Sequence, residues 1–411
     1  MRSGVLLAAA VLGLAITAAR AAQDKQNFTI IERGRYLALL GDCAACHTEP
    51  GSGQAFAGGR PIETPFGTVL APNITPDRDT GIGAWTDDEF VDALQKGVGR
   101  GGVHLYPAMP YTYYTRATRE DVLAIRAYLA TVAPVRHAVV SNQLPFPFDI
   151  RASMLAWNRL FFSPGRLAPT PAKSAEWNRG AYLVEGLAHC GMCHTPKNFL
   201  GGDETSQHLK GNVVQGWYAP DITDDARRGL GGWSVDDIVA YLRSGHNRIA
   251  AASGPMAEEV TRSSAQMDES DLRAIAVYLK DQPGGEEHAA PLAVDDARMR
   301  TGSAIYADEC SACHTPNGGG IAGLFPALNG APAVQSADPT SLIRVVLQGA
   351  QSAATPAAPT GPAMPQFAWL LDNAKVASVI TYIRNAWGNA APPVSIERVA
   401  AERHRLSRRA D

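Results

Sequence analysis

The chain has 411 residues, with 37 Lys and Arg against 40 Asp and Glu and a formal net charge of −3. This slightly acidic balance argues against nucleic acid as a partner, because proteins that bind the phosphate backbone carry a surplus of basic residues. The length predicts two or three domains. With 39 Gly, 28 Pro and only 7% aromatic residues, the composition favours small, loop-rich domains.

The N-terminus has the pattern of a secretory signal peptide. An apolar run from Val5 to Ala19 follows Arg2 and leads into a small-x-small cleavage site, Ala19-Arg20-Ala21. The run is short for a membrane-spanning helix, so cleavage after Ala21 or Ala22 is predicted in preference to an uncleaved anchor. We therefore expect residues 1–21 to be removed and the mature protein to be exported to the periplasm.

All six cysteines fall in three copies of the pattern C-x-x-C-H. The motifs are Cys43, Cys46 and His47; Cys190, Cys193 and His194; and Cys310, Cys313 and His314. This spacing attaches a c-type haem, since two thiols one helical turn apart form thioethers to one porphyrin and the histidine becomes an iron ligand. A lone C-x-x-C could be a zinc clip or a redox dithiol. Three copies that use every cysteine predict three covalently bound haem c groups.

A longer repeat surrounds the first two motifs. Arg33-Gly34-Arg35-Tyr36-Leu37 corresponds to Arg179-Gly180-Ala181-Tyr182-Leu183, and Pro72-Asn73-Ile74-Thr75 corresponds to Pro220-Asp221-Ile222-Thr223. Gly302 and Tyr306 precede the third motif in the same way. The first two domains are therefore predicted to be duplicates.

A middle helix and a closing helix are predicted after each motif. Thr86 and Ser234 are expected to cap helices that begin with acidic residues and end at Gly97 and Gly245. Later helices with apolar residues at helical spacing are expected over 120–132, 268–280 and 372–387, and they carry Tyr128, Tyr278 and Tyr382.

Between these helices each domain offers a methionine in a loop that contains proline. Met109 and Met256 each lie 62 residues after their motif histidine, and Met364 lies 50 residues after His314. A thioether is a soft sixth ligand that raises the reduction potential of haem iron. We expect Met109, Met256 and Met364 to bind iron.

Other roles and other ligands remain open. A methionine is often simply core filler. Met154 competes with Met109 but lies in a later helix-like stretch, His104 could replace Met109 at the first haem, and Met267 could replace Met256 at the second, although it breaks the equal spacing.

The connecting segments differ in character. The linker 141–175 carries Ile150, Met154, Trp157 and Phe161 at helical spacing, and this helix is expected to pack on its own domains, with a docking face for a partner subunit as the alternative. The linker 283–297 is short and polar. The tail 389–411 is rich in arginine, which suits either a helix on anionic lipid or a solvated segment.

The order of helix, C-x-x-C-H, middle helix, methionine loop and closing helix resembles the class I cytochrome c fold. The expected architecture is mainly α, with three tandem domains over 22–140, 176–282 and 298–388, each wrapped around one covalent haem. In this fold the first and last helices cross beside the haem edge.

Three further segments carry a more specific resemblance: Tyr106 to Tyr111, Gly216 to Thr223 and Gly254 to Glu258. Together with the haem motifs they resemble the triheme cytochrome c subunit of bacterial membrane-bound dehydrogenases, of the alcohol, gluconate, sorbitol, fructose and aldehyde dehydrogenase type. The resemblance implies a catalytic subunit with flavin, quinone cofactor or molybdopterin as partner, with or without a small third subunit. It also implies electron delivery to ubiquinone and peripheral association with the periplasmic side of the inner membrane. The chain departs from some relatives in lacking an apolar C-terminal anchor.

The expected function is electron transfer with no substrate chemistry of the chain's own, because three six-coordinate haems leave no open iron position. The rivals are a freestanding multihaem carrier, a multihaem peroxidase and a cytochrome module of a terminal oxidase. A peroxidase needs a five-coordinate haem, and no unmatched haem motif is available for one.

Overall fold

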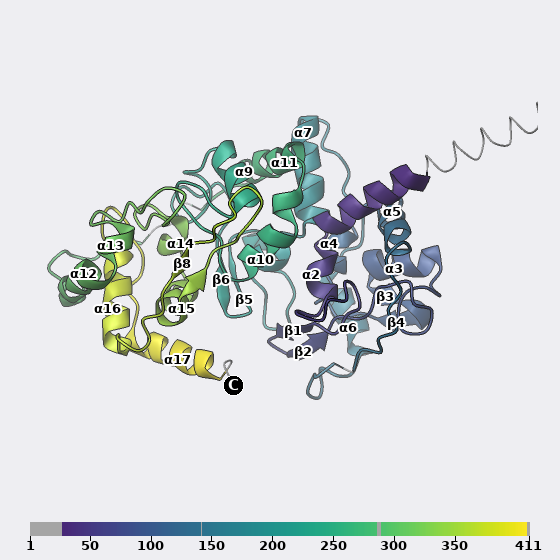
Figure 1. Ribbon diagram of the computed structural model, residues 1–411, viewed down its shortest axis with the longest axis horizontal. Coiled ribbons are helices and arrows are strands. Elements are labelled where there is room, and N and C mark those ends of the chain that lie inside the picture. The colour runs from purple at the N-terminus through teal and green to yellow at the C-terminus, as the bar shows by residue number, and fades with distance from the viewer. Residues whose placement is uncertain (1–26, 141, 286–288, 409–411) are drawn as a thin grey trace, which may run out of the picture.

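The computed structural model describes residues 27–140, 142–285 and 289–408. The expected signal peptide, 1–21, lies outside these residues. The prediction of a mainly α protein is confirmed, since the strands form only short two-stranded antiparallel pairs. Figure 1 shows three helical units in a row, from the N-terminal unit on the right to the C-terminal unit on the left.

The first unit opens with a helix over residues 27–40, and the haem motif follows it directly. Its further elements are α2 (Cys43–His47), β1 (Pro61–Thr64), β2 (Gly67–Leu70), α3 (Asp87–Lys96), β3 (Val98–Gly99), η1 (Arg100–Gly102), β4 (Val103–His104), α4 (Tyr111–Tyr114) and α5 (Arg119–Leu129).

The second unit repeats this order with one insertion. Its elements are α7 (Ala175–Tyr182), η2 (Leu183–Leu187), α8 (Gly191–His194), η3 (Thr205–Gln207), β5 (Asn212–Val214), β6 (Trp217–Ala219), α9 (Val235–Ser244), α10 (Pro255–Arg262), η4 (Ser264–Gln266) and α11 (Glu269–Lys280). Ten positions separate Gly180 from Cys190, against nine from Gly34 to Cys43. The segment η2 is a π-helix, which accommodates one extra residue within a continuous helix.

The third unit has its own helices and an additional one at its end. Its elements are α12 (Ala297–Glu309), α13 (Ser311–His314), α14 (Pro332–Gln335), α15 (Thr340–Gln348), β7 (Ala350–Gln351), β8 (Ala363–Met364), α16 (Asn373–Ile383) and α17 (Ile396–Ser407). Helix α15 stands where the expected order calls for a middle helix, but no residues were predicted for it, and Pro339 precedes it in place of a side-chain cap.

Helix α17 differs from both expectations for the tail. It packs on α15 and α16, and its Val399 and Leu406 are buried in the core of the third unit. Arg403 donates to the carbonyls of Ala368 and Leu371. Residues 396–407 are therefore part of the third bundle, and Arg398, Arg403 and Arg405 bind groups of the protein itself; residues 409–411 of the expected tail lie outside the described residues.

The expected helix caps are confirmed. Thr86 with Glu89 and Ser234 with Asp237 form capping boxes at the starts of α3 and α9. Gly97 and Gly245 end these helices with φ of 65° and 76°, a left-handed conformation that glycine adopts without strain.

In every unit the first helix crosses the closing helix at a glycine. A Cβ at Gly34, Gly180 or Gly302 would lie 1.8, 2.0 or 2.2 Å from the backbone oxygen of Ala124, Ala274 or Ser378. No side chain fits at these distances, so the two backbones meet directly. This contact explains why the repeat places glycine before each motif, and it agrees with the expected crossing of first and last helices.

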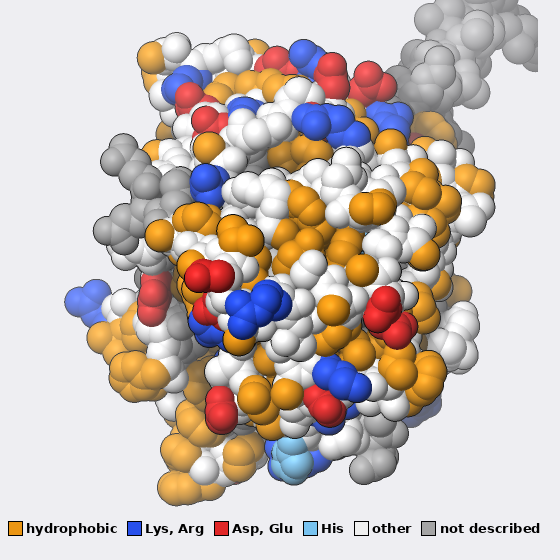
Figure 2. Space-filling model, turned by 90° about the vertical axis from the view of Figure 1, so that its left-hand side faces the viewer, with side chains coloured by type: hydrophobic (Ala, Val, Ile, Leu, Met, Phe, Trp, Pro, Cys, Tyr) orange, Lys and Arg blue, Asp and Glu red, His pale blue; other side chains and the backbone are white. Residues whose placement is uncertain are grey.

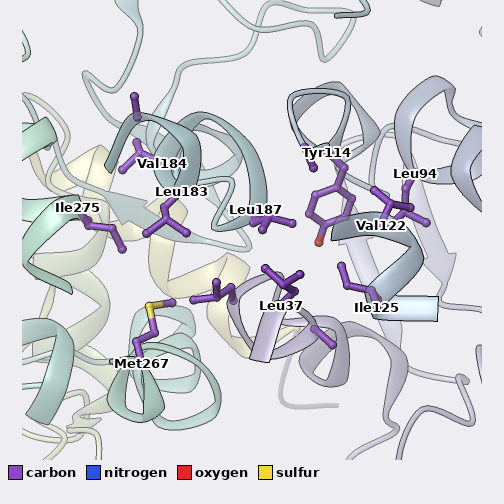
Figure 3. Packing of buried hydrophobic residues seen from close by; sticks show 14 of the residues in the cluster. Leu37, Leu94, Tyr114, Val122, Ile125, Leu183, Val184, Leu187, Met267 and Ile275 are labelled. Carbon is purple, nitrogen blue, oxygen red and sulfur yellow. The ribbon is translucent and has the colours of Figure 1, made fainter. Parts of the chain in front are cut away.

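The first two units share one hydrophobic core. Figure 3 shows Leu37, Tyr114 and Ile125 of the first unit in one layer with Leu187 and Ile275 of the second. The third unit has a separate core around Ile343, Val376 and Ile380. The duplicated units therefore form one double body to which the third is joined.

Helix α6 (Ser153–Phe161) lies in the first linker and bridges the first two units, as expected. Tyr111 donates to the Asn158 side chain at 2.7 Å, and Trp157 Nε1 donates to the Leu200 carbonyl at 2.9 Å. Within the described residues, the chain has no helix of the length and hydropathy that a bilayer crossing requires.

Candidate haem-binding sites

The six motif cysteines lie at short helical turns that follow the first helix of each unit. All six are free thiols. Burial raises the pKa of Cys43 to about 12 and the pKa values of Cys46 and Cys310 to about 11. Redox dithiols and metal thiolates require lowered pKa values, and the described residues contain no group of three or more His, Cys, Asp or Glu side chains fit to hold a metal ion. The raised pKa values of Cys43, Cys46 and Cys310 count against the redox-dithiol interpretation.

Each motif histidine is held by a proline carbonyl. Nδ1 lies 2.7 Å from the Pro72 oxygen for His47 and 2.7 Å from the Pro220 oxygen for His194. The distance from His314 Nδ1 to the Pro326 oxygen is 3.1 Å. A carbonyl only accepts, so Nδ1 carries the proton and Nε2 keeps its lone pair. Burial also lowers the pKa of all three imidazoles.

This arrangement is the one that an iron-binding histidine needs. The second ring nitrogen of a metal ligand is normally held by a carbonyl or carboxylate, which fixes the tautomer and the ring orientation. The repeat that begins at Pro72 and Pro220 was visible in the sequence. Its role as hydrogen-bond acceptor was not, and the equivalent Pro326 had no sequence signal.

Several buried polar atoms in the first two units lack hydrogen-bond partners. Trp233 Nε1, His246 Nε2 and His104 Nδ1 are buried and have no hydrogen-bond partner within the described part of the chain. Buried polar groups are almost always hydrogen-bonded. A bound haem, with its propionates and its iron, is a group that supplies such partners, so these residues fit haem. No pattern in the sequence marked Trp233 or His246 as a neighbour of haem.

The three expected methionines lie at corresponding places after the middle helices. Met109 occupies the loop between β4 and α4 and packs against the shared core. Met256 lies in the first turn of α10, beside the small cluster of Ala252, Val260 and Ala353. Met364 ends the strand β8, which pairs with β7, so the expected irregular loop is partly a hairpin.

The alternative ligands have different surroundings. Met267 is only 5% exposed and lies within the shared core near Leu183 and Ile275 (Figure 3). His104 is part of β4, and its carbonyl accepts a hydrogen bond from Arg151. Met154 belongs to α6.

The first and second haem motifs meet through α10. Helix α10 packs against α2. Arg60 donates to the Ala45 carbonyl inside the first motif at 2.7 Å, and it also forms a two-pronged ion pair with Glu258 of α10, with one bond of 2.7 Å. The Ser263 hydroxyl at the end of α10 donates to the Leu39 carbonyl at 2.8 Å.

The second and third methionine loops also meet. The amide of Ala353 donates to the Ala252 carbonyl at 3.2 Å, and Ser253 forms a β-bridge with Ser352. Ala353 is buried against Val260 of α10. The second site therefore adjoins both of the others, and α10 is the element common to the two contacts.

Known proteins resemble the chain closely. The Cytochrome c family profile matches residues 31–133 and 299–387. The gluconate 2-dehydrogenase cytochrome c subunit of Pantoea cypripedii is 40% identical over 93% of this chain and 91% of its own. The alcohol dehydrogenase (quinone) cytochrome c subunit of Gluconacetobacter polyoxogenes is 37% identical over 95% and 87%. The fructose dehydrogenase cytochrome subunit of Gluconobacter japonicus is 37% identical over 90% and 82%.

These similarities agree with the haem motifs and the crossed helices. The chain is a cytochrome c. It belongs to the family of cytochrome c subunits of bacterial membrane-bound dehydrogenases, which transfer electrons and are not the catalytic subunits of their complexes.

Proposed function

We propose that the chain carries three c-type haems, receives electrons from the catalytic subunit of a dehydrogenase complex, and delivers them to ubiquinone at the periplasmic side of the inner membrane. The observation that carries this proposal is the repeated hydrogen bond from a motif histidine to a proline carbonyl, at all three motifs. A freestanding carrier is the alternative, and the gluconate, alcohol and fructose dehydrogenase names of the relatives favour the subunit.

The residues that would hold the haems are the six cysteines, with His47, His194 and His314 as proximal ligands. Met109, Met256 and Met364 are proposed as the distal ligands. Each haem would supply a one-electron Fe(III)/Fe(II) couple, at a raised potential because of the thioether ligand. The protein's part is to fix the imidazoles, exclude water with its apolar cores, and hold neighbouring sites against each other through α10.

Met256 is preferred to Met267 at the second site. Met256 lies where the second unit repeats the position of Met109, whereas Met267 already fills space in the core next to Leu183. Met267 also breaks the equal spacing of 62 residues from the motif histidine that Met109 and Met256 share.

Absorbance spectroscopy of the full secreted chain tests the ligands. Replacement of Met109, Met256 or Met364 by alanine should each remove about a third of the sulfur-to-iron charge-transfer band, since each haem contributes one such bond. Met267→Leu is the matched control and should leave the band intact. Loss of the band in Met267→Leu, with retention in Met256→Ala, would reverse the assignment at the second site.

A haemochrome assay and purification test the remaining parts. Haem per chain should fall by about a third when both cysteines of one motif are replaced by serine. Mild detergent extraction should yield the chain together with a larger subunit that has dehydrogenase activity. Recovery only as a lone monomer, with no quinone reduction when substrate is added to the extract, would favour the freestanding carrier.

A further inference from the structure

Helix α6 carries apolar side chains on both of its sides. Trp157 and Phe161, four residues apart, face the body, where Phe161 lies against Gly202. On the other side Leu155 is 58% exposed and Leu160 is 68% exposed. Large apolar side chains exposed together on one side of a helix are typical of a surface that contacts a membrane or another protein.

The neighbouring segments extend this surface. Phe148 packs on the ring of Phe66 with centroids 4.9 Å apart, and Phe66 in turn lies against Gly201. Phe146 is 78% exposed and Phe199 is 87% exposed. We call the exposed apolar residues of these segments the α6 surface; they are Phe146, Phe148, Ile150, Leu155, Leu160, Phe199 and Leu200.

Basic side chains predominate on α6 and the segment that follows it, although the exposed Asp149 lies between Phe148 and Ile150. Residues 150–175 contain four basic side chains and no acidic one, in a chain whose net charge is −3. Arg159 and Arg166 are exposed, and neither forms an ion pair or a hydrogen bond with any other residue that the structure describes. Exposed aromatic and aliphatic groups beside unpaired arginines are the composition of helices that lie on anionic lipid.

The face formed by the third unit does not combine these properties. The side formed by the third unit has apolar groups, but Lys and Arg alternate there with Asp and Glu (Figure 2). In α17, Arg398 pairs with Asp338, and Arg403 and Arg405 bind carbonyls of the protein. The arginines of α17 are thus used inside the fold.

We propose that the α6 surface rests on an anionic phospholipid bilayer, with Leu155, Leu160 and the phenylalanines at the level of the acyl chains and Arg159 and Arg166 against phosphate groups. This inference deepens the proposed function, because a subunit that reduces a membrane quinone has to meet the bilayer. The inference places the membrane contact at the first linker, on the double body of the first two units.

Vesicle sedimentation with the haem-loaded chain tests the proposal. The wild-type protein should bind vesicles of phosphatidylglycerol and phosphatidylcholine, bind pure phosphatidylcholine more weakly, and lose the difference at high salt. The double variant Leu155→Asp and Leu160→Asp should bind both kinds of vesicle about tenfold more weakly or worse, since two apolar insertions are lost. Arg159→Gln with Arg166→Gln should keep the weak binding and lose the preference for the anionic vesicle.

Val294→Asp is the matched control, because Val294 is 86% exposed in the other linker, and it should bind as the wild type does. Haem content of each variant verifies folding. Wild-type binding by the Leu155 and Leu160 double variant overturns the proposal, as does concentration-dependent dimerisation that this variant abolishes. Vesicle binding without quinone reduction would contradict the proposed function alone, and reduction of a water-soluble quinone without vesicle binding would contradict the α6 surface alone.

Discussion

The hydroxyl of Tyr36 donates a hydrogen bond of 2.9 Å to the carboxylate of Asp271, across the boundary between the first and second units. The equivalent residues of the repeat form the same contact in the other direction, because the hydroxyl of Tyr182 in the second unit donates to Asp121 in the first at 2.6 Å. Each aspartate is also bound by the arginine of its own unit, Arg33 or Arg179. The duplicated helices therefore lock the two units together through a pair of reciprocal contacts.

This lock predicts a measurable loss of stability. Asp121 and Asp271 are 3% and 6% exposed, so removing a donor leaves a buried carboxylate short of one hydrogen bond. Tyr36→Phe and Tyr182→Phe should each lower the free energy of unfolding by about 1 to 3 kcal/mol. Chemical denaturation followed by far-UV circular dichroism measures this. Tyr128→Phe is the control, since no hydrogen bond is recorded for its hydroxyl within the described residues, and equal stability of all three variants would refute the lock.

The glycine crossings predict a sharper effect. Gly302→Ala places a Cβ 2.2 Å from the Ser378 oxygen, so α12 and α16 must separate, at a cost of about 1 to 3 kcal/mol or more. Because α13 follows α12 directly, the third motif should load haem poorly and haem per chain should fall by up to about a third. Gly232→Ala is the control, with its nearest neighbour at 3.8 Å. Full haem loading and an unchanged melting temperature for Gly302→Ala would contradict the close crossing.

The ion pair between Arg60 and Glu258 predicts opposite shifts of reduction potential. Removing a cation favours the more positively charged oxidised state, and removing an anion favours the reduced state. Arg60→Gln should therefore lower, and Glu258→Gln should raise, the midpoint potentials of the first and second haems in a spectroelectrochemical titration. Arg248→Gln, which breaks an exposed ion pair with Asp237, should leave them unchanged. Shifts of the same sign in both variants would show only a loosened structure.

Glu259 predicts a pH dependence of stability. Burial raises its pKa from 4.5 to about 7. The Ser264 hydroxyl, which donates a hydrogen bond of 3.0 Å to the carboxylate, acts in the opposite direction. Between these two pKa values the folded chain holds a proton that the unfolded chain releases. The contribution of Glu259 to the free energy of unfolding is therefore complete below about pH 4.5 and is lost as the pH rises through 7. Thermal unfolding between pH 5 and 8 measures the decline in melting temperature, and Glu259→Gln should flatten it. A variant that declines as steeply as the wild type would exclude Glu259 as the source.

Much of the local structure followed from short-range patterns. Thr86 and Ser234 cap helices, and Gly97 and Gly245 end them, because these effects depend on residues within one helical turn. The closing helices exist as expected, and α11 ends at Lys280 as predicted, but α5 and α16 end earlier, at Leu129 and Ile383. Apolar spacing does not fix the last turn, since frayed ends cost little.

The sequence by itself determined the chemistry of the sites. The cysteines and histidines are neighbours in the chain, so their spacing alone predicts covalent attachment and one iron ligand. The repeat further indicated that the first two units are copies of one another.

Only the tertiary structure decided how these units are joined. Tyr36 and Asp271 are 235 positions apart, and Arg60 reaches Glu258 over 198; no local rule relates residues at such separations. The place of α17 in the third core and the exposed outer side of α6 were settled in the same way. The burial of an apolar residue depends on which distant segment covers it, and that is fixed only when the whole chain has packed.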